Sequence, residues 1–497
     1  MATTVITTAT TREPGDGTGK DDPLPDAGRR PVQDPLTAVL EALDAAGLAH
    51  CRLRGPSVDG AGQRELDLLV DPRHTRRLAR VVADRGFVRR MAWGRGGRLV
   101  FVTFDGTAGE WLKLDAVTTL RYGGKGRPLA SRALRGALTR RARVGRTWEL
   151  DPPDAILGLL LHGVLDKRSF AGPRRAEIEE LRRLIQKDAD LTARTSARFR
   201  QALGSALPWQ AACEMIGAGN WERLLGERRR IAWVMCRRDP AGCARRWLEE
   251  SLLGLARRIR RPLALGGYSV ALLGPDGAGK TTLARTLAAD PQLRARVVYM
   301  GTNVGTATVE LPGAAWIRRR ERGRRFGRFG GGVLYLLRLL EQSYRTLVAL
   351  GWRWRGRLVV FDRHPDELRI APPARGAGPR LRRWLLARAS VPPDLVLVLD
   401  APSPVLRHRK PEHELARLDR HRERYRSLPR MGSSIQLVEA SGDEREVARR
   451  VKHIIWSEYV GRSRRSGHAA AGVRSSPVPA APNSIEDRGS SHHESPA

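Results

Sequence analysis

The stretch from Tyr268 to Leu283 constrains the fold of this chain more than any other. An apolar run, Val270 to Leu273, is followed by Gly274, a glycine-rich segment and then a helical pattern. A short apolar run closed by glycine is typical of a buried strand in a parallel sheet. The sequence therefore predicts a strand, a loop and a helix in immediate succession.

The loop matches the phosphate-binding pattern of glycine, four residues and then Gly-Lys-Ser/Thr. Its expected nucleotide-binding residues are Gly274, Pro275, Asp276, Gly277, Ala278, Gly279, Lys280, Thr281 and Thr282. Glycines let backbone N–H groups face an anion, and the N-terminus of the following helix adds positive potential. We expect Lys280 to reach the β- and γ-phosphates of ATP and the Thr281 hydroxyl to hold Mg²⁺. An ordinary glycine turn is the alternative.

Two further apolar runs predict buried strands of the same sheet. Leu358 to Phe361 ends in Asp362 and Arg363, and a second run ends at Asp400. A carboxylate at the carboxyl end of such a strand can meet Mg²⁺ or the attacking hydroxyl, so Asp362 is a candidate metal ligand. Arg363 can hold an acceptor phosphate by paired hydrogen bonds. A structural salt link between Asp362 and Arg363 is the alternative.

The composition is that of a globular chain with a strongly basic surface. Hydrophobic residues make up 41% of 497 residues, and the formal net charge is +36. Length alone favours about three domains. A basic surface can attract nucleic acid, but the basic residues are mostly arginines spread along the whole chain. We therefore favour arginines that clamp a phosphorylated substrate, with nucleic acid as the minority alternative.

Cysteine usage and hydropathy point to a reducing compartment. The four cysteines, Cys51, Cys213, Cys236 and Cys243, show no paired spacing that would indicate zinc or a disulfide framework. The first 34 residues lack the apolar core of a signal peptide. Charged residues interrupt the apolar stretch from Val333 to Leu350, which excludes a membrane span there. We expect a cytoplasmic protein and leave a homodimer open.

Composition shifts divide the chain into five parts. We expect disordered tails at 1–34 and 461–497, an α+β domain at 35–150, a helical connector at 151–262 and an α/β phosphate-loop domain with a parallel sheet flanked by helices at 263–460. The connector starts at Asp151-Pro152, a helix-start signal. Its His162 is expected to pack in the core, because no partner at metal-binding spacing is near.

Three carboxylates in the 35–150 part form a separate candidate site. Glu65 and Asp67 alternate with leucines on one predicted strand, and Asp115 lies in a similar run. Carboxylates on neighbouring strands suit two-metal chemistry. The pattern resembles the nucleotidyltransferase superfamily, whose Gly-Ser turn would map to Gly55 and Ser57. Solvent-facing acids on an edge strand are an equally open interpretation.

Over residues 267 to about 457, the order of loop, strand ends and lid resembles that of the nucleoside-monophosphate kinases. Among these, it is most similar to the thymidylate kinase family. The segments that carry this likeness are the loop from Gly274 to Thr282, Phe361-Asp362-Arg363-His364, and Pro393 to Asp400 followed by an arginine-rich lid. The resemblance implies that Asp276 positions the acceptor and that Asp362 and Arg363 serve the acceptor phosphate. It also implies that lid residues such as Arg407 and Arg409 neutralise the transferring group.

Two segments depart from that family. Its acceptor loop is replaced by Gly301 to Gly305, and its thymine-binding segment is absent from His364 to Arg388. We therefore predict an ATP- and Mg²⁺-dependent phosphotransferase acting on a nucleoside monophosphate or another small phosphorylated acceptor. The alternatives are a nucleic-acid-associated or regulatory ATPase, or a bifunctional enzyme with an added nucleotidyltransferase activity.

Overall fold

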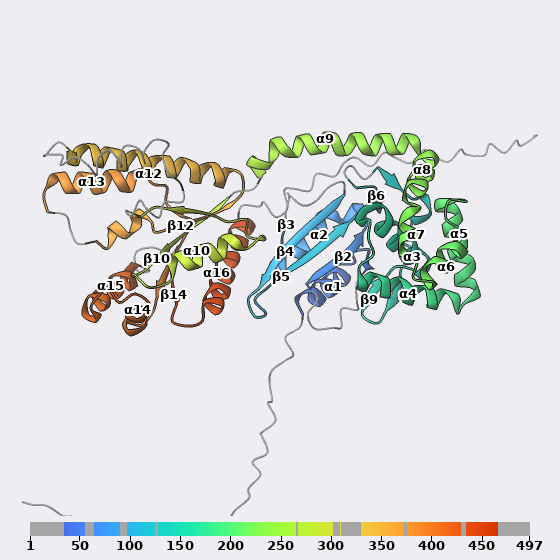
Figure 1. The fold of residues 1–497 in the computed structure, drawn as a ribbon, viewed down its shortest axis with the longest axis horizontal. Coiled ribbons are helices and arrows are strands. Elements are labelled where there is room, and N and C mark those ends of the chain that lie inside the picture. Colours follow the sequence, from blue (N-terminus) through green and yellow to red (C-terminus); the bar gives the residue numbers. More distant parts are fainter. Residues whose placement is uncertain are drawn as a thin grey trace, which may run out of the picture. The chain divides into compact units, whose positions relative to one another are not determined.

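The structure is a computed structural model. It describes residues 34–54, 64–89, 97–124, 128–264, 267–301, 309, 330–371, 375–428 and 434–465 (Figure 1). The predicted disordered tails fall mostly outside these ranges. The last helix, α16 (Glu444–Arg465), continues beyond residue 460, so the prediction of disorder is wrong for 461–465.

A five-stranded parallel sheet carries the glycine-rich loop. Its order is β11-β12-β10-β13-β14. The strands are β10 (Tyr268–Leu273), β11 (Arg296–Tyr299), β12 (Leu358–Asp362), β13 (Leu395–Asp400) and β14 (Ile435–Glu439). The strand that leads into the loop, β10, is central, with β12 on one side and β13 on the other. In an open sheet of this kind, ligands bind at the carboxyl ends of strands where the chain reverses its winding direction.

Both faces of this sheet are covered, because its central strands are apolar on both sides. Alternate β10 residues pack on one face against α10 (Lys280–Ala289) and α16. On the other face they pack in a core that includes α12 (Gly330–Trp354), as Figure 1 shows. The remaining helices of this part are α13 (Ala377–Arg388), α14 (Ser403–Arg409) and α15 (Leu415–Ser427). The predicted parallel sheet with flanking helices is confirmed.

The first part of the chain forms a mixed sheet of seven strands in the order β3-β4-β5-β2-β1-β9-β8. The strands are β1 (His50–Arg54), β2 (Glu65–Val70), β3 (Val88–Arg89), β4 (Arg98–Asp105), β5 (Glu110–Val117), β8 (Ala142–Val144) and β9 (Thr147–Glu149). Two helices, α1 (Pro35–Ala45) and α2 (Thr75–Asp84), bury their apolar faces in the same core as alternate strand residues. Because β2 lies between β1 and β5, it is not an edge strand.

A helical segment follows, as the sequence predicts. A short hairpin, β6 (Arg121–Tyr122) with β7 (Leu129–Ala130), contributes to its single apolar core. The helices are α3 (Pro152–Leu161), α4 (Gly172–Gln186), α5 (Ala189–Leu203), α6 (Trp209–Gly217), α7 (Trp221–Gly226), α8 (Arg228–Arg238) and α9 (Pro240–Ala264). A π-helical turn, His162–Lys167, extends α3. The exact boundaries of the five parts stay predictions.

The structure describes His162 and the four cysteines, for which the sequence gives expectations. His162 is buried, and its Nδ1 lies 3.0 Å from Asp166 Oδ2, which agrees with a packing role. The four cysteines are free thiols. Among the described helices, none combines the length and the apolar content needed to cross a bilayer.

We expect the parallel sheet to depend on its fully buried strand residues. Leu397 of β13 is 0% exposed, so Leu397→Ala leaves a cavity and lowers the free energy of unfolding by about 2–5 kcal/mol. Leu437 of β14 is 46% exposed, so Leu437→Ala serves as the matched control with an effect of under about 1 kcal/mol. Urea unfolding followed by fluorescence measures both. Equal losses in the two variants would contradict this packing.

Candidate functional site

The loop after β10 brings its backbone against the neighbouring strand and helix. Gly274 has φ +142°, and a Cβ placed there would lie 2.4 Å from the carbonyl oxygen of Leu399 in β13. At Gly277, with φ +87°, it would lie 2.8 Å from the carbonyl oxygen of Leu406 in α14. Only glycine tolerates both this backbone conformation and this approach. The loop can therefore turn tightly and lead directly into α10, which begins at Lys280.

The Lys280 side chain lies within the loop and not in bulk solvent. It is 6% exposed, and its Nζ donates hydrogen bonds of 2.8 Å to the carbonyl oxygens of Gly274 and Pro275. Burial lowers the pKa of Lys280 to about 8, and the nearby Arg363 charge acts in the same direction. The ammonium group therefore sits at the helix N-terminus, where an anion's charge would be neutralised.

A hydrogen bond joins the start of α10 to the end of β12. The Thr281 hydroxyl donates to Asp362 Oδ2 at 2.8 Å. Asp362 is 3% exposed, and its other oxygen, Oδ1, is shielded from solvent without a hydrogen-bond partner among the described residues. A hydroxyl beside a buried carboxylate with an available oxygen is a donor set that suits Mg²⁺. These residues therefore fit the metal that the sequence predicts.

Arg363 is held in a strained conformation beside the loop. Its φ is 67°, a left-handed value that residues other than glycine rarely adopt. Its backbone N–H donates to the carbonyl oxygen of Leu272 at 3.3 Å, and its Nη2 donates to Asp276 Oδ1 at 2.6 Å. Burial alone would raise the pKa of Asp276, but the Arg363 and Lys280 charges lower it to about 2. The guanidinium group therefore stands beside Asp276 of the loop, at the carboxyl edge of the sheet.

In the arginine-rich region after β13, the two arginines expected over the phosphates do not contact the loop acid Asp276. Arg407 is exposed on α14, and Arg409 Nη1 donates to the carbonyl oxygen of Ala440 at 2.9 Å. The side chains nearest to Asp276 Oδ2 from this region are instead Lys410, with Nζ at 4.0 Å, and His413, with Nε2 at 3.6 Å. The role of Arg407 and Arg409 as lid cations stays a prediction.

Sequence reasoning also missed an acid in the turn η5 (Pro365–Arg369), which follows β12. Glu367 Oε2 lies 3.8 Å from Arg363 Nη1. Burial raises the pKa of Glu367, although the charges of Arg363 and Lys280 oppose this. The signal available in the sequence was weak, because an acid four residues after Arg363 has no motif of its own.

The structure thus brings together most of the predicted loop site. The loop, Lys280, Thr281, Asp362 and Arg363 meet at one edge of the sheet. Ala278 of the loop is buried in the apolar core, and Thr282 is exposed on α10. The predicted acceptor-side segment from Gly301 to Gly305 falls outside the described residues except for its first residue.

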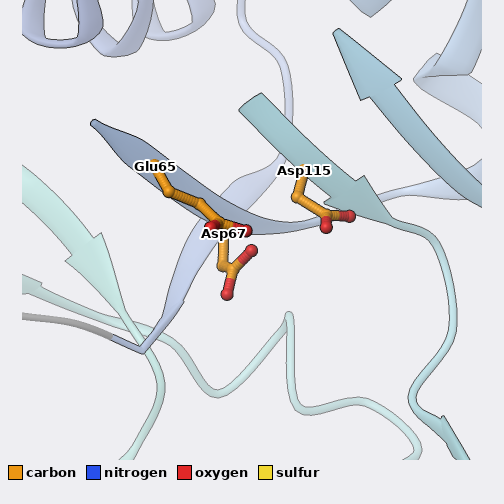
Figure 2. A group of neighbouring side chains, drawn as sticks. All are labelled: Glu65, Asp67 and Asp115. Atoms are coloured by element: carbon orange, nitrogen blue, oxygen red, sulfur yellow. The ribbon is translucent and has the colours of Figure 1, made fainter. Parts of the chain in front are cut away.

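A second group of carboxylates lies on β2 and β5 (Figure 2). The strands are parallel and pair Asp67 with Asp115, and ligand oxygens from Glu65, Asp67 and Asp115 all lie within 4.8 Å of one another. The three side chains extend toward the same region, as the view shows. This confirms that the predicted carboxylates share one face of neighbouring strands. The predicted turn residues Gly55 and Ser57 lie outside the described residues.

Two basic side chains, Arg98 and Lys113, contact the carboxylates of this group. Arg98 Nε donates to Asp115 Oδ1 at 2.6 Å and to Oδ2 at 2.9 Å, and Nη2 also bonds to Asp115. Lys113 pairs with Glu65, and its Nζ lies 3.6 Å from Asp115 Oδ2. Because Asp115 is 2% exposed, these contacts supply its charge balance. A divalent ion at this place would have to displace or share them.

Comparison with curated proteins finds relatives that match part of the chain. A thymidylate kinase of Xanthomonas campestris is 31% identical over 214 residues, which cover 41% of this chain and 88% of the relative. A thymidylate kinase of Xanthomonas euvesicatoria is 31% identical over 219 residues, covering 42% and 91%. One from Xylella fastidiosa is 36% identical over 139 residues, covering 27% and 59%.

A comparison with family models finds no match. Among solved structures, a thymidylate kinase from Candida albicans aligns with a TM-score of 0.30 and 13% identity, covering 39% of this chain and 93% of that one.

The burial of Lys280 predicts a pH effect on stability. The pKa of Lys280 is about 8 in the folded chain, compared with 10.5 for an ordinary lysine side chain in an unfolded chain. Between pH 8 and pH 10.5 the unfolded chain therefore binds more protons than the folded chain. The free energy of unfolding of the wild type should therefore rise from pH 7.5 to pH 10 relative to Lys280→Met, by up to about 3 kcal/mol. Urea unfolding at both pH values, with exposed Lys187→Met as control, measures this. A pH-independent difference between wild type and Lys280→Met would contradict it.

Proposed function

This chain belongs to the thymidylate kinase family, and we propose that its 263–460 part is an ATP- and Mg²⁺-dependent phosphotransferase. The phosphoryl group passes from ATP to a nucleoside monophosphate or another small phosphorylated acceptor. The observation that carries this proposal is the meeting of Lys280, Thr281, Asp362 and Arg363 at one edge of the parallel sheet. Donor-side and acceptor-side groups are thereby within reach of one another.

On the donor side, the chain binds and orients phosphates. The loop N–H groups and the N-terminus of α10 face the nucleotide, and Lys280 moves its ammonium group from the loop carbonyl oxygens to phosphate oxygens. Thr281 and Asp362 would hold Mg²⁺, which when bound neutralises phosphate charge and orients the leaving group. Catalysis then rests on positioning and electrostatic stabilisation, because phosphoryl transfer needs no covalent protein intermediate.

On the acceptor side, Arg363 holds the acceptor phosphate by its guanidinium fork. The ion pair with Asp276 keeps this fork at the strand edge before the acceptor binds. Asp276 stays ionised at neutral pH, because its pKa is about 2. We propose that Lys410, together with the predicted Arg407 and Arg409, supplies positive charge over the transferring group and excludes water. Asp276 then links the loop to this lid.

A specific observation favours a second activity in the 35–150 part. The carboxylates of Glu65, Asp67 and Asp115 are spaced for divalent metal ions, which supports nucleotidyl transfer as an additional reaction. The ion pairs of Asp115 with Arg98 and Lys113 weigh against tight metal binding. A nucleic-acid-associated ATPase would use the same loop, and the net charge of +36 favours that alternative.

Replacing the loop lysine tests the main proposal. We measure ATP-to-ADP conversion with a panel of nucleoside monophosphates and sugar phosphates as acceptors. Lys280→Ala should lower this rate by at least about 100-fold, because the ATP phosphates lose the ammonium group that neutralises their charge. Exposed Lys187→Ala is the control and should keep wild-type turnover. Thermal unfolding serves as the check that both variants are folded. Undiminished turnover in Lys280→Ala would reject the site, and acceptor-independent hydrolysis stimulated by DNA or RNA would favour the ATPase alternative.

The acidic group has its own test in the full-length chain. ATP labelled at the α-phosphate should transfer its nucleotidyl group in a metal-dependent way, and Asp67→Asn should reduce this by about 100-fold while phosphotransfer stays within about twofold. Asp84→Asn, at an exposed position of α2, is the matched control. Metal-dependent transfer that survives Asp67→Asn, or no transfer by the wild type, would reject this second activity.

A further inference from the structure

The junction between α8 and α9 carries a cysteine on each side of one connecting residue. Cys236 lies in the last turn of α8, and Cys243 lies in the first turn of α9. The connecting residue, Asp239, bonds to both cysteines through its backbone. Its N–H donates to the carbonyl oxygen of Cys236 at 3.2 Å, and its carbonyl oxygen accepts from the N–H of Cys243 at 2.9 Å. The chain therefore turns sharply at Asp239 and brings the two helix ends together.

The Cys243 thiol has two neighbours that bear on its reactivity. Burial raises the pKa of Cys243, and the Cys236 thiol adds to this rise as a hydrogen-bond neighbour. The Arg246 guanidinium group opposes the rise, because its Nη2 lies 3.5 Å from Cys243 Sγ and stabilises the thiolate form. Arg246 is held in place by a hydrogen bond of 2.9 Å from its Nη1 to Asp239 Oδ2. The two thiols are therefore close to one another, with a fixed positive charge next to Cys243.

The two thiols differ in their access to solvent. Cys236 is exposed, whereas Cys243 is 6% exposed and packs in the apolar core of the helical segment. A buried cysteine alone is explained by packing, because a thiol behaves as a small apolar group. Packing does not explain an exposed thiol that neighbours a buried thiol and a guanidinium group. An exposed thiol can meet an oxidant from solution, and a neighbouring thiol can then react with the product.

We propose that Cys236 and Cys243 are a redox pair that hydrogen peroxide converts into an intramolecular disulfide. In the first step, the Cys236 sulfur attacks one oxygen of the peroxide and the O–O bond breaks. The other oxygen leaves as hydroxide and takes up the thiol proton, which gives water. Cys236 becomes a sulfenic acid, and its sulfur has lost two electrons to the peroxide. This modification site does not depend on the proposed phosphotransferase function.

In the second step, the Cys243 sulfur attacks the Cys236 sulfur. The S–O bond of the sulfenic acid breaks, its hydroxyl group leaves with the Cys243 proton as water, and the S–S bond forms. Arg246 stabilises the negative charge that develops on the Cys243 sulfur as its proton leaves. Altogether one peroxide is reduced to two water molecules while two thiols are oxidised to one disulfide. A dithiol reductant such as dithiothreitol returns both thiols by exchange.

Mass spectrometry of the folded full-length chain tests this pair. The reduced protein is treated with hydrogen peroxide, unfolded, blocked with iodoacetamide and digested with trypsin. Because trypsin cleaves after arginine, Cys236 and Cys243 fall on separate peptides, 231–237 and 239–245. We expect a disulfide between these peptides in at least about 10-fold higher yield than any pairing that involves Cys51 or Cys213. No linked peptide, or equal yields for all pairings, would overturn the proposal.

Two variants separate a redox pair from independent oxidation of each thiol. In Cys243→Ser the sulfenic acid on Cys236 loses its partner, so labelling of Cys236 by dimedone, which reacts with sulfenic acids, should rise at least about 10-fold over the wild type. Equal labelling in both proteins would overturn the proposal. In Cys236→Ser, Cys243 should stay a free thiol after peroxide treatment, and its oxidation there would also overturn the proposal. Because Cys236 is exposed, Cys236→Ser decides the question alone if Cys243→Ser does not fold.

Discussion

A single hydrogen bond, from the Thr281 hydroxyl to the Asp362 carboxylate, couples the two halves of the loop site. It fixes the start of α10 against the end of β12, so the helix N-terminus and the strand-end carboxylate share one edge of the sheet. Arg363 follows in the chain and is turned toward Asp276 by its left-handed backbone. The proposed donor and acceptor sides therefore depend on one local geometry.

The site balances its charges within a small volume. Lys280, Arg363 and Lys410 bring positive charge, and Asp276, Asp362 and Glu367 bring negative charge. Buried charges are costly when they lack partners. The carboxylates therefore stabilise the basic side chains at the strand edge while no phosphate is bound. Asp276 contacts Arg363, which directly follows β12, and lies near Lys410 and His413 in the segment after α14. A phosphate that competes for Arg363 and Lys410 would therefore alter contacts on both sides of the loop at once.

The parts of this site that the sequence predicts are those set by local spacing. The loop pattern fixes Lys280 and Thr281 relative to Gly274, and an apolar run ending at Asp362 places that acid at a strand end. Glu367 could not be predicted in the same way, because its position depends on how η5 folds back onto the loop. Arg409 shows the same limit, since its contact with Ala440 is set by tertiary packing.

The two carboxylate sites look alike in sequence but differ in electrostatics. Asp362 is bonded by a neutral hydroxyl, which can stay in place as a ligand when a cation arrives. Asp115 is bonded by the guanidinium group of Arg98, which a cation would have to displace. Lys113 lies two residues before Asp115 on the same strand, so strand alternation alone already places its charge on the same face. An aspartate carried by a strand is therefore better suited to metal binding beside the Thr281 hydroxyl than beside the Arg98 guanidinium group.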